Sequence, residues 1–279
     1  MSPFFRNAGY TALCRTPATN RQTLIRKRSI FVVPRGSRVA WSILERLGRF
    51  DGSSNLPYPI MMKDTACRIF SVLFNQYIRE DTNLNFLEFD NPFQILIMTI
   101  LSAQTTDRTV NSVKDRLFDV YPEPALMAEA DQSDIEDIIR PTGFYRTKSR
   151  NIRGASEMLV RDFGGVVPDS MEELIKLPGV GRKTANIVLN HAYGIDAGIA
   201  VDTHVKRVSY RLGMTDNTDP DKIEKDLTAL FPKVVWGKIN FLLISHGRAV
   251  CDAKKPACDK CCIKEYCRYY RDNNSPDKE

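Results

Sequence analysis

From residue 62 onward, apolar side chains recur along the chain every three or four residues, which is the spacing of amphipathic helices. The first such segment has its apolar side chains at Ala66, Ile69, Phe70, Leu73, Phe74 and Tyr77. The segment FQILIMTIL at 93–101 is instead apolar on every side, which is typical of a helix buried at the centre of a domain. No segment has the strict alternation of a β-strand, so the pattern predicts an all-α fold.

Helix start signals accompany this pattern. Asn91 and Asp219 each precede a proline, as an N-cap residue precedes a proline at the first helical position. Ser133 and Ser170 each precede a glutamate by three residues, which is the spacing of a capping box. The predicted loops between helices cover 102–107, 141–145, 178–181 and 194–201.

Charge is distributed unevenly along the chain. The 279 residues have a formal net charge of +6, but residues 1–60 hold ten Lys and Arg against two Asp and Glu, a net of +8, which leaves −2 for residues 61–279. An Arg-rich segment without periodicity is typical of a basic nucleic-acid arm or an organelle transit peptide, and an unstructured upstream extension is the plainer alternative. No run approaches the roughly 20 apolar residues of a membrane span, so no membrane is expected as a partner.

The stretch LPGVGRKTAN at 177–186 predicts a helix-hairpin-helix. Gly179 and Gly181 permit backbone angles closed to other residues, so that free amides at the start of the second helix can approach a phosphate. Arg182 and Lys183 place cations where the helix dipole disfavours them. That field and the Arg182 charge should make Lys183 lose its proton more readily, and a neutral amine can attack a sugar carbon. A plain turn with a solvated Lys183 is the alternative.

A carboxylate follows about twenty residues later. Asp202 lies where a predicted loop enters a helix, so it is well placed to act as an N-cap that binds the amides of His204 and Val205. If Asp202 lies near Lys183, its carboxylate can also take part in proton transfer and stabilise a cationic sugar. The two roles are compatible.

Cysteines cluster near the C-terminus with the spacing C-x6-C-x2-C-x5-C, formed by Cys251, Cys258, Cys261 and Cys267. Because the chain has no convincing secretory signal, this clustering predicts a metal site rather than disulfides. Tetrahedral zinc and an iron–sulfur cluster both suit the spacing, and Cys262 falls outside it. Lysines interleave with the cysteines, and Lys255 among them is a candidate phosphate contact, with a solvated side chain as the alternative.

Five stretches together resemble the endonuclease III family and occur in its order: LSAQTTD at 101–107, GFYRTKSRNI at 143–152, the hairpin stretch, VDTHVKR at 201–207, and HGRAVC with the four cysteines. The resemblance covers about Met62 to Tyr270. It implies a base excision repair DNA glycosylase with AP lyase activity that removes oxidised pyrimidines from double-stranded DNA. It also implies a [4Fe–4S] cluster on the four cysteines, and a monomer that works with DNA inside the cell.

The resemblance further implies two helical domains that flank a DNA-binding cleft. A six-helix domain with the hairpin is expected over 85–195. An iron–sulfur cluster domain is expected to combine 62–84 with 196–279, after a basic extension over 1–60 that is expected to be disordered.

Family roles can be carried onto individual positions. Lys183 matches the lysine that forms the Schiff base, and Asp202 matches the catalytic aspartate. Gln104 matches the glutamine that fills the gap left by the extruded nucleotide, although the sequence alone also permits a residue at the end of a helix. Phe144 matches the wedge position, where leucine is usual, and a buried Phe144 is the alternative; the basic residues near it, Lys148 among them, argue against burial.

Two other activities stay open on the sequence alone. A mismatch-directed glycosylase would excise a base but cut the strand poorly, and a non-catalytic module would only bind damaged DNA. Relatives specialised for mismatched bases carry other residues at the lysine position, so the presence of Lys183 favours the lyase.

Overall fold

The computed structural model describes residues 61–274; the predicted extension over 1–60 and the last five residues lie outside the described part. All regular elements within 61–274 are helical, so the predicted all-α class is confirmed. In this part no single helix combines the length and apolarity of a membrane span, and only the pair Pro220–Leu230 and Lys233–Ala249, bent by 115°, passes on length and composition.

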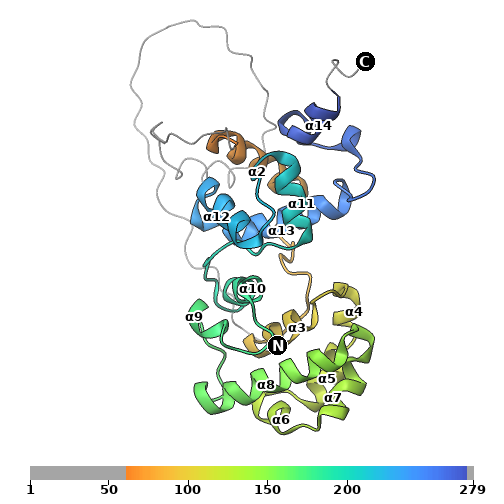
Figure 1. Ribbon diagram of the computed structural model, residues 1–279, viewed down its shortest axis with the longest axis vertical. Coiled ribbons are helices and arrows are strands. Elements are labelled where there is room, and N and C mark those ends of the chain that lie inside the picture. The colour runs from red at the N-terminus through yellow and green to blue at the C-terminus, as the bar shows by residue number, and fades with distance from the viewer. Residues whose placement is uncertain (1–60, 275–279) are drawn as a thin grey trace, which may run out of the picture. The chain divides into compact units, whose positions relative to one another are not determined.

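A first hydrophobic core is formed by buried residues between Leu87 and Leu189. Its elements are α3 (Pro92–Leu101), α4 (Asp107–Asn111), α5 (Lys114–Val120), α6 (Pro124–Glu129), α7 (Gln132–Ile139), the 3-10 turn η1 (Arg140–Thr142), α8 (Tyr145–Phe163), α9 (Met171–Leu174) and α10 (Arg182–Tyr193). Helix α3 is buried from Phe93 to Leu101 and packs against α8 and α10 (Figure 1). Helix α3 is therefore apolar on every side because it lies at the centre of this core, as expected.

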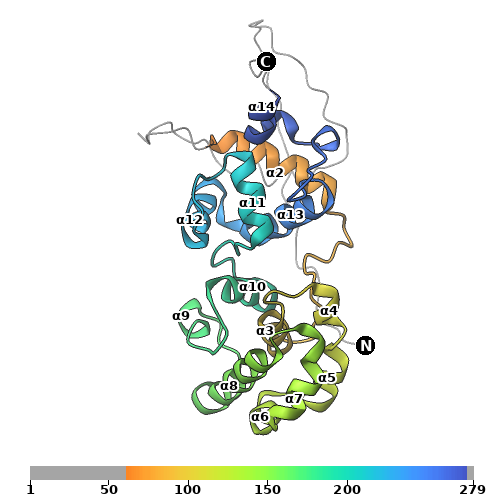
Figure 2. The same ribbon diagram turned by 45° about the vertical axis from the view of Figure 1, so that its right-hand side comes forward.

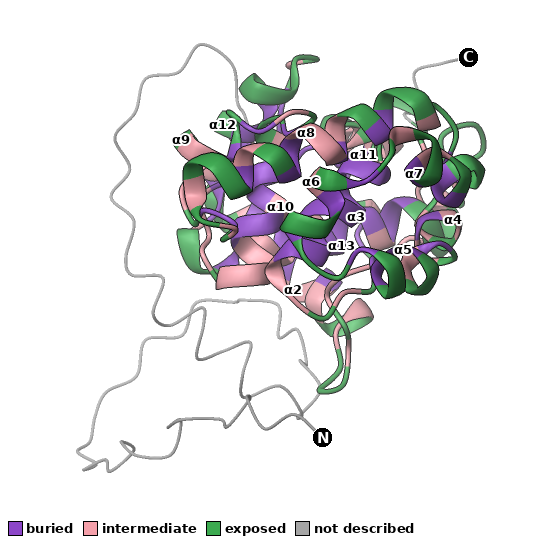
Figure 3. Ribbon diagram, turned by 90° about the horizontal axis from the view of Figure 1, so that it is seen from below, coloured by how far each residue is buried: buried purple, intermediate pink, exposed green. Residues whose placement is uncertain are grey.

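A second core contains buried residues of 66–73 and 199–267. Its elements are α2 (Lys63–Tyr77), α11 (Thr203–Leu212), α12 (Pro220–Leu230), η2 (Lys233–Val235), α13 (Trp236–Ala249), η3 (Cys258–Lys260), η4 (Lys264–Tyr266) and α14 (Arg268–Asn273). Helix α13 packs against both α2 and α11, and α11 packs against α14; the four helices lie together in Figure 2. Figure 3 shows that much of α3 and α13 is buried, whereas α6 exposes part of its surface. Two segments distant in sequence thus build this core.

The segment between α10 and α11 is held in place by side chains on both sides. The Asp196 carboxylate accepts hydrogen bonds from Asn190 Nδ2 at 2.7 Å and from the Gly237 amide at 3.1 Å. The Asn240 side chain donates to the Ala200 carbonyl at 2.6 Å. Because α13 supplies Gly237 and Asn240, this extended segment enters α11 along a fixed path.

Most of the predicted helix starts are confirmed. The side chains of Asn91, Ser170 and Asp219 accept a hydrogen bond from the backbone amide three residues later, and a proline follows Asn91 and Asp219 as expected. The capping box predicted at Ser133 is wrong. Helix α7 begins one residue earlier, at Gln132, with Asp131 at the N-cap, so Ser133 lies inside the first turn.

His191 gives the first core a measurable pH dependence. Burial lowers the pKa of His191 from 6.5 to about 4, and its ring packs edge-on against Phe89. The unfolded chain therefore takes up a proton that the folded chain excludes, and we expect the free energy of unfolding to fall as the pH is lowered from 6.5 to about 4. Urea unfolding across this range measures the slope. An equal slope in His191→Gln would contradict this origin.

Candidate active site

The hairpin between α9 and α10 has the predicted open geometry. Gly179 has a φ of +78°, and a Cβ there would lie 2.9 Å from the side chain of Asn151, so glycine is required for both reasons. Gly181 is the N-cap of α10, no side chain caps the helix there, and a Cβ at Gly181 would meet nothing within 4 Å. The first amides of α10 are thus unsatisfied by any side-chain cap and open to an approaching anion.

Lys183 and Arg182 differ in their surroundings. Lys183, the second residue of α10, is half-buried and takes part in none of the ion pairs among the described residues. The Arg182 guanidinium donates from Nε to Glu224 Oε2 at 2.6 Å and from Nη2 to Oε1 at 3.2 Å. The hydrogen bond to Glu224 raises the pKa of Arg182, so the charge expected to act on Lys183 is balanced by a carboxylate.

Glu224 connects three segments of the chain. Its side chain on α12 is 6 % exposed, and it also accepts a hydrogen bond from Asn186 Nδ2 at 2.9 Å, one turn beyond Lys183. A Cβ at Gly198 would lie 1.9 Å from Glu224 Oε1, so the segment before Asp202 passes directly over the carboxylate. Arg182, which is next to Lys183, and Gly198, which is four residues before Asp202, therefore both lie against one buried acid.

Asp202 caps α11, as expected. Its Oδ1 accepts a hydrogen bond from the Val205 amide at 2.7 Å, and the side chain is half-buried. No hydrogen bond to Asp202 Oδ2 is present among the described residues, so this oxygen is available for another partner. The capping bond fixes the carboxylate in orientation, which suits a group that must stabilise a charge at a defined point.

The two residues expected to occupy the DNA gap share an unusual backbone. Gln104 (φ +54°) and Phe144 (φ +47°) are the non-glycine residues with positive φ in the described chain. Both are exposed, and Phe144 retains 69 % of its accessible surface, so the alternative of a buried Phe144 is wrong. Left-handed backbone at a non-glycine residue costs about 1–3 kcal/mol and concentrates at functional sites.

Cations flank Phe144, but not all of those expected. The guanidinium groups of Arg140 and Arg146 lie 5.2 and 5.4 Å from the centroid of the Tyr145 ring. Lys148, which the sequence groups with these exposed cations, is only 4 % exposed. The structure therefore separates Lys148 from the basic surface.

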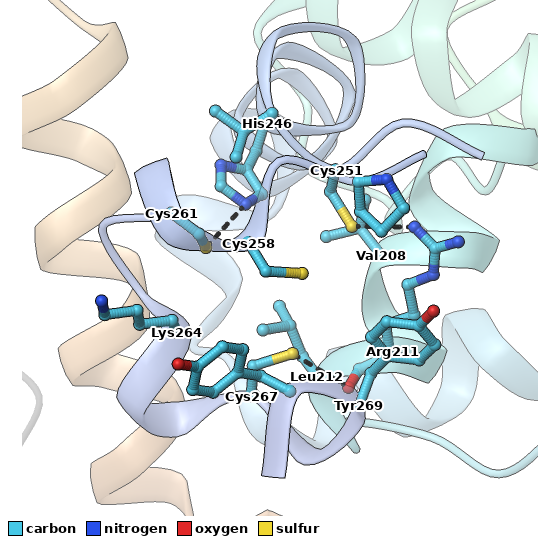
Figure 4. Close-up of a pocket in the computed structure, with 13 residues that line it drawn as sticks. Val208, Arg211, Leu212, His246, Cys251, Cys258, Cys261, Lys264, Cys267 and Tyr269 are labelled. Carbon is cyan, nitrogen blue, oxygen red and sulfur yellow. Dashed lines mark hydrogen bonds between the residues drawn. The ribbon is translucent and has the colours of Figure 1, made fainter. Parts of the chain in front are cut away.

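The four predicted cysteine ligands line one pocket (Figure 4), whose apolar wall includes Val208 and Leu212. Cys262 is exposed and does not line the pocket. The pocket therefore contains the thiols of Cys251, Cys258, Cys261 and Cys267.

Two polar side chains that sequence reasoning missed reach these sulfurs. Arg211 Nη1 donates to Cys251 Sγ at 3.3 Å. His246 lies between Cys261 Sγ, 3.5 Å from its Nε2, and the Tyr77 hydroxyl, 3.0 Å from its Nδ1. His246 begins the stretch HGRAVC, so the sequence contained a signal for it, whereas Arg211 and Tyr77 come from distant helices.

Lys255 lies on an exposed loop whose backbone amides bind the side chain of Asp252. The Asp252 carboxylate accepts hydrogen bonds from the amides of Lys254 at 2.8 Å and Lys255 at 3.0 Å. Both lysine side chains project from the protein surface. The arrangement suits contact with an anion.

Comparison with known proteins finds similar sequences. Residues 97–233 match the family model of the HhH-GPD superfamily base excision DNA repair proteins. Endonuclease III of Synechocystis sp. is 52 % identical over 181 residues, which are 65 % of this chain and 83 % of that protein.

Two solved structures share the fold. A non-covalent endonuclease III–DNA complex is 39 % identical and superposes with a TM-score of 0.71 over 76 % of this chain and 98 % of that one. A trapped endonuclease III–DNA covalent intermediate, an estranged-adenine complex, has the same identity and TM-score and covers 76 % of this chain and 99 % of that one.

The Glu224 contacts yield a prediction about stability. In Glu224→Gln the Arg182 guanidinium loses a buried charged acceptor, so we expect the free energy of unfolding to fall by about 1–3 kcal/mol. Asp221→Asn, an exposed acid on the same helix, is the control and should change it by less than about 0.5 kcal/mol. Denaturant unfolding measures both. Equal effects of the two substitutions would show that burial and pairing of Glu224 contribute nothing.

Proposed function

Because the chain belongs to the endonuclease III family and is a base excision repair DNA glycosylase with AP lyase activity, we propose that Lys183 carries out both reactions on oxidised pyrimidines in double-stranded DNA. The observation that carries this assignment is the position of Lys183. It is a half-buried lysine without an ion pair among the described residues, two positions beyond an uncapped glycine at a helix start. A nucleophilic amine needs such freedom from acidic partners.

The proposed reaction uses one nitrogen for two bond cleavages. The Lys183 nitrogen attacks C1′ of the extruded nucleotide, and the damaged base leaves with the electrons of the glycosidic bond. The nitrogen then loses a proton and the C1′–O4′ bond breaks, which opens the sugar ring and leaves a protonated imine at C1′. This imine acidifies the C2′ proton, and removal of that proton breaks the C3′–O3′ bond and expels the 3′ phosphate by β-elimination. The Asp202 carboxylate stabilises positive charge on the sugar and takes part in proton transfer. The trapped covalent complex of a relative supports a covalent intermediate in this chain.

Contacts with DNA are proposed at the hairpin and at the cysteine loop. The open amides after Gly179 and Gly181 bind a backbone phosphate. Arg182 keeps 49 % of its side chain exposed and has Nη1 free of Glu224, so it can contact DNA while it is anchored. Lys255 provides a second phosphate contact from the loop that Asp252 holds by hydrogen bonds.

Gln104 and Phe144 are proposed to occupy the space left when the damaged nucleotide leaves the stack. A base must leave the duplex before its C1′ can be attacked, and the unpaired partner then needs support. An exposed ring at position 144 can stack with bases, and an exposed amide at position 104 can hydrogen-bond to the partner base. Phenylalanine in place of the usual leucine gives a larger stacking surface.

Members of this family carry a [4Fe–4S] cluster, and we propose that the pocket cysteines hold it in this chain. The donor set fits, because four thiols line one apolar pocket and two further side chains reach their sulfurs. When bound, such a cluster crosslinks the lysine-bearing loop to the second core.

The remaining assignments follow from the same contacts. We propose that the two hydrophobic cores correspond to a domain over 85–195 and a cluster domain over 62–84 and 196–279. We also propose that the protein acts as a monomer. Its substrate places it with DNA inside the cell.

Borohydride trapping tests the nucleophile. Wild-type protein mixed with a duplex that contains thymine glycol, an oxidised pyrimidine, should give a covalent protein–DNA adduct, because borohydride reduces the imine. We expect Lys183→Ala to give no adduct. Denaturing electrophoresis measures it.

The matched control is Lys176→Ala, which removes an exposed lysine from the other side of the hairpin and should leave the adduct yield unchanged. Base release without an adduct in the wild type would indicate a glycosylase that lacks the lyase. An adduct that persists in Lys183→Ala would reject Lys183 as the nucleophile.

Iron content tests the cysteine assignment. Protein purified without oxygen should contain about four iron atoms per chain and absorb visible light. Cys258→Ser should lower the iron content strongly, because it removes a thiolate ligand. Cys262→Ser, which changes a neighbouring exposed thiol outside the pocket, should retain the full iron content. Zinc without iron in the wild type, or equal losses in both variants, would contradict the proposal.

A further inference from the structure

Lys148 is a buried cation, whereas Lys183 is half-buried and Lys255 is exposed. Lys148 lies in the first turn of α8 and is 4 % exposed. Its Nζ donates to Thr105 Oγ1 at 2.6 Å and to the Thr142 carbonyl at 2.7 Å. Both acceptors are uncharged, and no ion pair among the described residues includes Lys148.

Such an arrangement is unfavourable for stability alone. Burial disfavours the charged amine and lowers the pKa of Lys148 to about 8. A buried charge is normally paired with an opposite charge, and an apolar side chain of similar length would fill the space without this penalty. Stability alone therefore does not explain why a lysine occupies this position. The two groups that accept hydrogen bonds from its ammonium suggest what the lysine does.

The two acceptors belong to different loops. Thr105 directly follows Gln104, and Thr142 lies two residues before Phe144. The Thr105 hydroxyl also donates to the Thr142 carbonyl at 2.5 Å, so the three groups form a closed triangle. Thr142 is 2 % exposed and its own hydroxyl donates to the Ile139 carbonyl at 2.8 Å. The triangle thus ties both loops to the start of α8.

Each loop presents a side chain on strained backbone. Gln104 and Phe144 both have positive φ, and a left-handed non-glycine residue persists only where its surroundings hold it. Lys148 is four residues after Phe144, and its amide donates to the Phe144 carbonyl at 3.1 Å. Its side chain and its backbone therefore both restrain the segment that carries the exposed ring.

We propose that Lys148 is a positioning residue that locks the Gln104 and Phe144 loops together through Thr105 and Thr142, so that both side chains enter the DNA as one rigid unit. The inference rests on the proposed role of Gln104 and Phe144 in replacing the extruded nucleotide. Lys148 itself touches neither the sugar nor the base. It acts by fixing the distance between the two inserted groups before DNA binds.

Three substitutions separate the contact from the charge. Lys148→Met removes the ammonium but keeps the length of the side chain. Thr105→Val removes the hydroxyl acceptor without changing the charge or the volume, and Thr105→Ser restores the hydroxyl. Arg161→Met removes an exposed cation near the far end of α8 and is the control.

The readout is the single-turnover rate constant for release of thymine glycol from a duplex, together with the dissociation constant for undamaged duplex. We expect Lys148→Met and Thr105→Val to lower the rate constant about 10- to 100-fold, since a small misplacement of a positioning group has effects of this size. Binding of undamaged duplex should change by less than about threefold, because the phosphate contacts remain. Thr105→Ser and Arg161→Met should stay within about threefold of the wild type.

A double-mutant cycle with Phe144→Ala decides whether Lys148 acts through the ring. Interacting residues give non-additive effects, whereas independent ones add to within a factor of about two. We expect Lys148→Met to lower the rate constant by a clearly smaller factor in the Phe144→Ala background than in the wild type, because one of the two groups that Lys148 positions is gone. Thermal unfolding of all four proteins checks that the loss of coupling does not arise from a change in stability.

Two results would overturn the proposal. One is a Lys148→Met effect of the same size in both backgrounds, which would indicate a general structural role. The other is a Lys148→Met rate constant within about twofold of the wild type. Failure of the proposed function looks different, because the wild-type protein itself would then release no base.

Discussion

The buried carboxylate of Glu224 is the constraint on which the geometry of the catalytic region depends. An ionised group removed from water must have hydrogen-bond donors around it, and the donors come from Arg182 and Asn186 on α10. Because Gly198 also lies against the carboxylate, the chain that leads to Asp202 shares this anchor. The start of α10 is thereby fixed relative to α12, and the position of Lys183 follows from a pairing that Lys183 itself does not make.

The second buried charge, Lys148, follows a different physical logic. Glu224 is matched by an opposite charge, and its network joins helices whose side chains pack into different cores. Lys148 has only neutral oxygen acceptors, and it joins two loops at one end of the first core. The former secures the groups assigned to bond cleavage, and the latter secures the groups assigned to the vacated base position. Because hydrogen bonds hold the residues around both groups of side chains, these side chains need little rearrangement when the protein binds a distorted duplex.

Local sequence signals predicted the helical class, the hairpin and four of the five capping residues, because these features depend on neighbours within a turn or two. The capping box predicted at Ser133 is wrong because α7 begins at Gln132 with Asp131 at the N-cap position, although the Asp131 side chain makes no capping hydrogen bond. Lys148 was misjudged although it shares the spacing of the buried face of α8 with Ile152, because its charge alone suggested exposure. Glu224 was missed since its partner Arg182 lies 42 residues away.

The left-handed backbone at Gln104 and Phe144 lowers the stability of the folded protein at two positions that are proposed to act in repair. Glycine or asparagine adopts positive φ with less strain than glutamine or phenylalanine does. Selection for survival at high temperature alone would therefore favour these smaller residues in both loops. If the two side chains occupy the vacated base position as proposed, selection for that role would oppose the replacement, and the strain at both positions would be retained for function.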